Sequence, residues 1–103
     1  MIEVRQIAGG DPLKFAVAVR DERGESRHVV TMAPATYQEL TAGAHTPVKC
    51  IEAAFRFLLD QEPKEQILGR FDMAIVPHYF PDFERQLPDY FGGIKRSISS
   101  DQL

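Results

Sequence analysis

One short stretch collects the side chains best suited to proton transfer or ligand binding. His78, Tyr79 and Asp82 lie close together, and in a helix over residues 76–83 the first and last of them share one face. An imidazole beside a carboxylate is a common acid–base or ligand pair. Pro81 lies between them, however, and disfavours a regular helical face. We therefore treat His78, Tyr79 and Asp82 as a candidate ligand-binding group and assign no catalytic residue.

The other nucleophilic and metal-ligating residue types give weaker signals. Cys50 is the only cysteine, and a catalytic cysteine needs a lowered pKa and a nearby base. Its position among apolar residues favours a small buried side chain. The histidines His28, His45 and His78 are far apart, and no C-x-x-C or H-E-x-x-H spacing accompanies them. We expect no metal and no cofactor.

Most of the aromatic residues lie in the second half of the chain. We expect the majority to fill the core against a sheet. Tyr90 and Phe91 stand at the end of the patterned sequence, beside Gly92-Gly93 and the polar residues 94–103. Because aromatic residues are favoured at the centres of protein interfaces, these two are the interface candidates.

Length and charge narrow the class of protein. A chain of 103 residues fits one domain with a single core. The formal net charge is −3, and the sequence has no cluster of basic residues like that of nucleic-acid-binding proteins, so we expect no nucleic-acid binding. No apolar run is long enough to span a bilayer, and the first residues do not resemble a signal peptide. With a single cysteine, we expect a cytoplasmic protein that does not interact with membranes.

Alternating apolar residues predict three strands near the N-terminus. Residues 2–8 and 13–20 show the period of two that is typical of half-buried strands, and the turn residues Gly9 to Pro12 separate them. A charged loop with Gly24 leads into a third strand over residues 27–32. The sequence therefore predicts a three-stranded antiparallel meander.

The central element is an amphipathic helix over residues 46–60. Thr46 is a good N-cap, and Pro47 suits the first helical position. A capping-box pattern that begins at Thr36 predicts a shorter helix over residues 35–42, which ends at Gly43.

The conformation of residues 70–80 is left open by the sequence. Phe71, Met73 and Ile75 alternate as in a strand, while apolar and aromatic residues also recur every four positions from Ile67 onward. We favour helical turns, with Asp72 as an N-cap, after a short helix over residues 64–69. Prolines 77, 81 and 88 then break the C-terminal part into short pieces. Residues 1–91 are expected to form one α+β domain, and residues 92–103 a flexible tail.

One segment resembles small, functionally uncharacterised bacterial proteins. The pattern consists of Glu62-Pro63-Lys64-Glu65, Ile67-Leu68, Phe71-Asp72, Ile75 and Tyr79-Phe80-Pro81, about a fifth of the chain. The resemblance implies a bacterial origin and a compact α+β domain. It implies no activity and no functional residue.

Two functions are compatible with these patterns. The first is a non-catalytic interaction or accessory module that binds itself or another protein, because a small sheet leaves open edges that a second chain can pair with. The alternative is a small-molecule binder or enzyme with a pocket between the sheet and the C-terminal helices, using His78, Tyr79 and Asp82.

Overall fold

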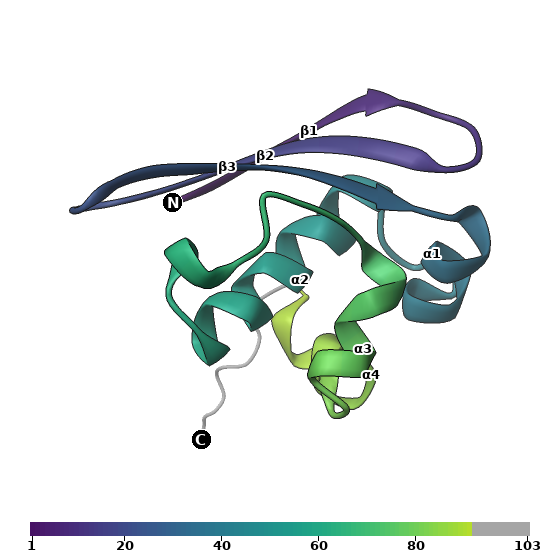
Figure 1. The fold of residues 1–103 in the computed structure, drawn as a ribbon. Coiled ribbons are helices and arrows are strands. Elements are labelled where there is room, and N and C mark those ends of the chain that lie inside the picture. Colours follow the sequence, from purple (N-terminus) through teal and green to yellow (C-terminus); the bar gives the residue numbers. More distant parts are fainter. Residues whose placement is uncertain (92–103) are drawn as a thin grey trace, which may run out of the picture.

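The computed structural model describes residues 1–91, so the predicted tail, 92–103, lies outside the described residues. A four-stranded sheet forms one layer, and the helices lie on one of its faces (Figure 1). The chain is thus an α+β protein. None of the described helices is long and apolar enough to cross a membrane. The strands are β1 (Ile2–Ala8), β2 (Leu13–Asp21), β3 (Gly24–Met32) and β4 (Arg70–Asp72); the α-helices are α1 (Pro34–Thr41), α2 (Pro47–Gln61), α3 (Val76–Tyr79) and α4 (Phe83–Gln86); the 3-10 helices are η1 (Lys64–Gln66), η2 (Met73–Ile75) and η3 (Leu87–Tyr90).

The sheet has the order β1-β2-β3-β4 and is mixed. The first three strands pair antiparallel, as the alternation predicted, although β3 begins at Gly24 rather than at residue 27. The prediction of a three-stranded meander did not include the fourth strand. This strand, β4, pairs parallel with β3 and places Phe71 beside Val30. The alternation around Phe71 was therefore a true strand signal, but only three residues long.

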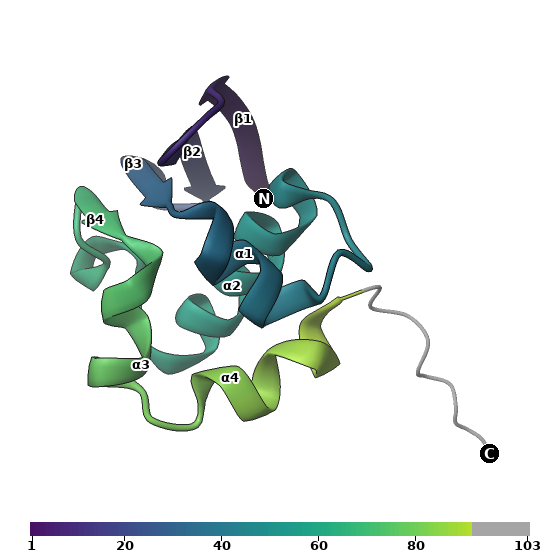
Figure 2. The same cartoon turned by 90° about the vertical axis from the view of Figure 1, so that its right-hand side faces the viewer.

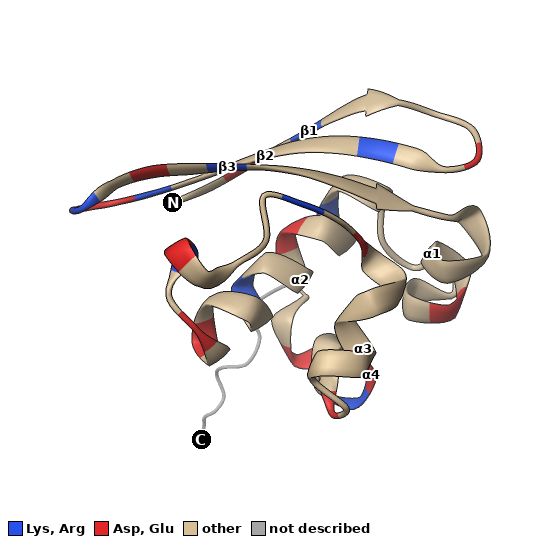
Figure 3. Ribbon diagram, in the orientation of Figure 1, with Lys and Arg blue, Asp and Glu red and all other residues tan. Residues whose placement is uncertain are grey.

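The core lies between the sheet and the helices. Phe15, Val17 and Val19 of β2 are buried on the helical side, together with most of the inner face of α2. Figure 2 shows α2 between the sheet and the C-terminal helices α3 and α4. The opposite face of the sheet carries Ala16 and Ala18, and none of the helices in residues 1–91 covers it (Figure 1). Charged residues occur along the strands, in the hairpin loops and in the helices (Figure 3).

Helix α2 begins as its sequence predicts. The Thr46 side chain accepts a hydrogen bond from the Lys49 amide at 3.1 Å, and Pro47 occupies the first turn. The start of α1 differs from the prediction, because its N-cap is Ala33 and no side chain caps it. Pro34 fixes a helical φ at the first position, so the helix starts before Thr36 and that residue lies inside it.

The C-terminal part is more fragmented than predicted. The expected helix over residues 64–69 is only the three-residue η1, because Ile67 is already extended. Asp72 is an N-cap, as expected, and its carboxylate accepts from the Ala74 amide at 3.0 Å. No continuous helix spans residues 76–83, since α3 ends at Tyr79 and α4 begins at Phe83.

Candidate functional site

The three predicted ligand-binding residues lie at two different helices. His78 and Tyr79 lie on α3 and are exposed, whereas Asp82 precedes α4 and forms an ion pair with Arg85 at 2.9 Å. The break between α3 and α4 removes the shared helical face on which the pairing of His78 with Asp82 depended. Of the three, only Tyr79 lines a pocket.

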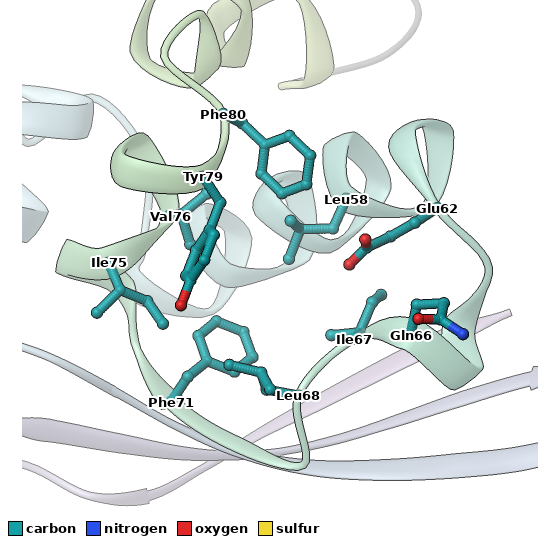
Figure 4. Close-up of a pocket in the computed structure, with 10 residues that line it drawn as sticks. All are labelled: Leu58, Glu62, Gln66, Ile67, Leu68, Phe71, Ile75, Val76, Tyr79 and Phe80. Atoms are coloured by element: carbon teal, nitrogen blue, oxygen red, sulfur yellow. The ribbon is translucent and has the colours of Figure 1, made fainter.

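This pocket, which we call the α2–α3 pocket, has a volume of about 230 Å³. It opens between the C-terminal end of α2, η1, the loop before β4, and α3 (Figure 4). The buried side chains of Leu58, Ile67, Phe71 and Val76 form its floor. The pocket therefore lies between the sheet and the C-terminal helices. The alternative function, a small-molecule binder or enzyme, expected a pocket in this region.

Two of the four exposed large hydrophobic side chains in the described part of the chain form the rim of this pocket. Leu68 is 51% exposed and Tyr79 is 68% exposed. The other two, Met1 and Ile7, lie at the N-terminus and on β1. An apolar rim above an apolar floor is typical of a ligand-binding concavity.

Polar groups occupy one side of the pocket. Figure 4 shows the Glu62 carboxylate pointing into it from the end of α2, with the Tyr79 ring on the opposite wall and Gln66 beside Glu62. Glu62 has no ion-pair partner within residues 1–91. Sequence reasoning missed Glu62 and Gln66, because nothing in their spacing shows that the chain turns back toward Tyr79.

His28 fixes the loop that carries Leu68. The ring is buried on the core face of β3 and packs 5.3 Å from the Phe55 ring. Its Nδ1 lies 2.7 Å from the Leu68 carbonyl oxygen and must donate to it, so Nε2 accepts from the Ser26 hydroxyl at 2.8 Å. This histidine is a positioning residue for the pocket rim.

Lys64 fixes η1, which carries Gln66. Its side chain is only 3% exposed, and its ammonium group contacts the Asp21 carboxylate at 2.9 Å as well as that of Glu65. The hydrogen bond to Glu65, followed by the one to Asp21, raises the pKa of Lys64. The same contacts lower the pKa of both carboxylates. The pairs therefore stay charged at neutral pH and tie η1 to the end of β2.

Asp72 positions the far wall of the pocket. One carboxylate oxygen accepts from the Thr31 hydroxyl at 2.5 Å, and the other caps η2 through the Ala74 amide. Because η2 continues into α3, this residue sets the direction in which Ile75 and Tyr79 leave the sheet.

Cys50 lies away from the pocket and is fully buried in the core, with its sulfur 3.9 Å from that of Met32. Burial raises the pKa of its thiol to about 12, so it is protonated and unreactive at neutral pH. Among residues 1–91, no group of three or more His, Cys, Asp or Glu side chains could hold a metal ion.

The two interface candidates pack on their own chain. The Tyr90 hydroxyl donates to the Asp60 carboxylate at 2.6 Å, and its ring meets Phe57 edge-on at 5.8 Å. The carboxylate raises the pKa of Tyr90 to about 12. Phe91 stacks on His45 at a centroid distance of 3.8 Å. Both remain half-buried, so their outer surfaces are still reachable.

The two edges of the sheet differ. On one side β4 has three residues. On the other, β1 has seven and, within residues 1–91, pairs only with β2. Most of β1 is exposed. An edge strand of this length offers a row of free backbone donors and acceptors to a second chain.

No protein-family model, no curated protein and no solved structure matches the chain.

Proposed function

We propose that the protein is a non-catalytic binding module whose α2–α3 pocket takes a compact apolar ligand with a cationic head. The observation that carries this proposal is the combination of an apolar floor, two exposed apolar rim residues, Leu68 and Tyr79, and the unpaired Glu62 carboxylate. We also propose that the protein acts in the cytoplasm, which the single cysteine supports.

The volume of the pocket limits the size of the ligand. An apolar cavity of about 150 Å³ holds benzene, and the α2–α3 pocket has about 230 Å³. It is smaller than the sites of most drug-sized ligands, which start near about 300 Å³. A single ring or a short branched chain with a few further atoms therefore fits best.

The charge in the pocket favours a cation over an anion. Glu62 provides the only charged group among the lining side chains, and a bound ammonium group would form a charge-assisted hydrogen bond to it. The exposed Tyr79 ring on the opposite wall offers a second favourable surface to a cation. The lining contains no histidine, cysteine, serine or lysine, which supports binding rather than catalysis.

Calorimetric titration with phenethylamine, a single ring with an ammonium group, tests this function. We expect a dissociation constant in the range of about 0.1 to 1 mM, since a fragment of this size makes few contacts. Its neutral analogue 2-phenylethanol should bind more weakly, and the anion 3-phenylpropionate more weakly still. Tyr79→Ala should weaken phenethylamine binding about fivefold, while Ile7→Ala, which removes another exposed large hydrophobic residue, on β1, should not.

The titrations distinguish a wrong ligand class from a pocket that binds no ligand. If the three probes bind equally and Tyr79→Ala weakens all of them, the pocket binds ligands but the cationic preference is wrong. If none of the probes binds at concentrations of several millimolar, the pocket is not a site for compact apolar ligands.

A second candidate function is self-association through β1, since that strand is an unpaired edge. If two copies of β1 pair antiparallel about Val4, Glu3 of each copy faces Arg5 of the other, and the two valines face one another. Opposite charges directly across two strands are stabilising, and the arrangement has the two-fold symmetry of most homodimers. This pairing would join two sheets into one.

Light scattering over a range of concentrations tests the dimer. We expect the mass of a dimer for the natural chain. Glu3→Arg and Arg5→Glu should each weaken the dimer because they place like charges opposite each other, whereas the double exchange should restore it. A monomer at every concentration would exclude pairing through β1. A chain that ends at Phe91 retains the whole of β1, so pairing through β1 predicts a dimer for it too.

A further inference from the structure

The face of the sheet opposite the helices carries a strip of small side chains. Ala16 and Ala18 of β2 and Val29 of β3 lie at its centre, and no helix of the described part of the chain covers them (Figure 1). A shallow hollow of about 600 Å³ lies over this face. Small side chains allow the backbone of a partner to approach closely.

Basic residues surround the strip. Cross-strand register places five basic and three acidic side chains on the open face: Arg5, Lys14, Arg20, Arg27 and Arg70 against Glu3, Glu25 and Asp72. The remaining described residues carry five basic and eleven acidic side chains. The protein is therefore acidic as a whole but has one basic face.

Several of these basic side chains are not neutralised. Arg20 and Arg27 share the Glu25 carboxylate, whose pKa their contacts lower, and Arg20 also pairs with Glu3 at 3.4 Å. These two arginines are therefore balanced by two carboxylates. Arg5, Lys14 and Arg70 form no ion pair within residues 1–91. Asp72 is held by Thr31 and by the amide of residue 74, which leaves it less available to these cations.

The spacing of the free arginines matches a helix. Arg5, Ala16, Val29 and Arg70 form one row across the four strands. Three strand spacings separate the two arginines, which corresponds to about 14 Å between their Cα atoms. An α-helix with its side chains is about 10–12 Å wide, so it would lie on the small central residues with an arginine at each flank.

We propose that this open face docks an acidic α-helix of a partner protein. Small or apolar residues of the helix rest on Ala16, Ala18 and Val29, and its flanking carboxylates pair with Arg5 and Arg70. A single-stranded nucleic acid is a poorer match, because the face has no aromatic side chain on which bases could stack.

A designed peptide can serve as the probe. It is an α-helical peptide of three heptads. In each heptad, the two positions of one helix face are alanine and the two positions that flank this face are glutamate. The other three positions are glutamine. Titration into the isotopically labelled full chain should move the amide resonances of residues 14–20 and 27–31, and leave those of α3 and α4 unchanged. Binding should weaken at least about fivefold between about 50 and 300 mM salt, because exposed charges are screened.

Two pairs of substitutions separate this face from the rest of the surface. Arg5→Glu with Arg70→Glu should weaken peptide binding at least about tenfold. Arg56→Glu with Arg85→Glu, which removes the same charge from exposed positions on α2 and α4, should change it less than about twofold. If the first pair disturbs folding, Arg5→Gln with Arg70→Gln provides the milder test, with the same direction expected.

Three results would overturn the proposal. The first is no binding of the glutamate peptide at millimolar concentration. The second is equal binding of a peptide in which lysine replaces every glutamate. The third is tighter binding of a twenty-nucleotide oligothymidine to the same residues, which would identify the face as a nucleic-acid surface. None of these results bears on the α2–α3 pocket, which lies on the other side of the sheet.

Discussion

His28 shows how one buried polar side chain can position a site that it does not enter. Both of its ring nitrogens are bonded, one of them to the Leu68 carbonyl at the pocket rim. His28→Ala would leave that carbonyl without its partner and open a gap beside Phe55. We expect a loss of about 1–3 kcal/mol in the free energy of unfolding, measured by urea denaturation. His78→Ala, at an exposed position, should change it by less than about 0.5 kcal/mol, and an equal loss in both variants would contradict this role.

Cys50 should make the protein sensitive to alkali. The pKa of its thiol is raised from 9.0 to about 12 by burial, so above pH 9 the unfolded chain loses this proton while the folded chain keeps it. Stability therefore falls as the pH rises from about 9 to about 12, by at most about 1.4 kcal/mol per pH unit. Between pH 8 and pH 10.5, the natural chain should lose about 2 kcal/mol more than Cys50→Ala.

Tyr90 titrates in the same alkaline range, but it is present in both of these chains and its effect cancels in the comparison. Parallel stability curves for the two chains would show that the thiol titrates alike in the folded and unfolded states, and would contradict the burial argument.

At the residue scale, the sequence predicted the environment of a side chain well where adjacent residues determine it. It predicted the environment poorly where residues distant in the chain determine it. The burial of Cys50 followed from its place on an apolar helix face. The shared face of His78 and Asp82 assumed a continuous helix across Pro81, and α3 ends at Tyr79 before α4 begins at Phe83. Glu62 and Tyr79 line opposite walls of one pocket because the chain turns back between α2 and α3, and no local pattern predicts that turn.

At the scale of secondary structure, the threonines near the starts of α1 and α2 allow a direct comparison of a capping with a non-capping residue. Thr46 caps α2, whereas Thr36 lies inside α1, which has no side-chain cap. Thr46→Ala should lower the free energy of unfolding by about 1 kcal/mol, because the Lys49 amide loses its acceptor. Thr36→Ala should have little effect or stabilise slightly, since alanine is the better helix former. The reverse order in thermal or urea denaturation would contradict this assignment of the caps.

Elements with a strong local signal were predicted well, and those that depend on distant contacts were not. Alternation identified β1, β2 and β3, and capping with a long apolar face identified α2. β4 has three residues and exists because residues 70–72 return to lie along β3, some forty positions away in the chain. A pairing this distant leaves no periodic pattern long enough to recognise.

At the scale of the whole molecule, a ligand that binds only the folded state must raise its stability. With phenethylamine at ten times its dissociation constant, the gain is about 1.4 kcal/mol, or about 5–10 °C in the midpoint of thermal unfolding for a domain of this size. Tyr79→Ala should show a smaller shift at the same ligand concentration. No shift for the natural chain, at a concentration where calorimetry reports binding, would mean that the ligand also binds the unfolded chain.

The most direct test of the α2–α3 pocket is a residue-by-residue map of phenethylamine binding by amide chemical shifts. The pocket predicts saturable shifts in residues 58–62, 66–71 and 75–80, and none in β1 or on the open face of the sheet. These shifts should give a single dissociation constant that agrees with calorimetry. Shifts that do not saturate, or that centre on the sheet instead of on Glu62 and Tyr79, would contradict the proposed function.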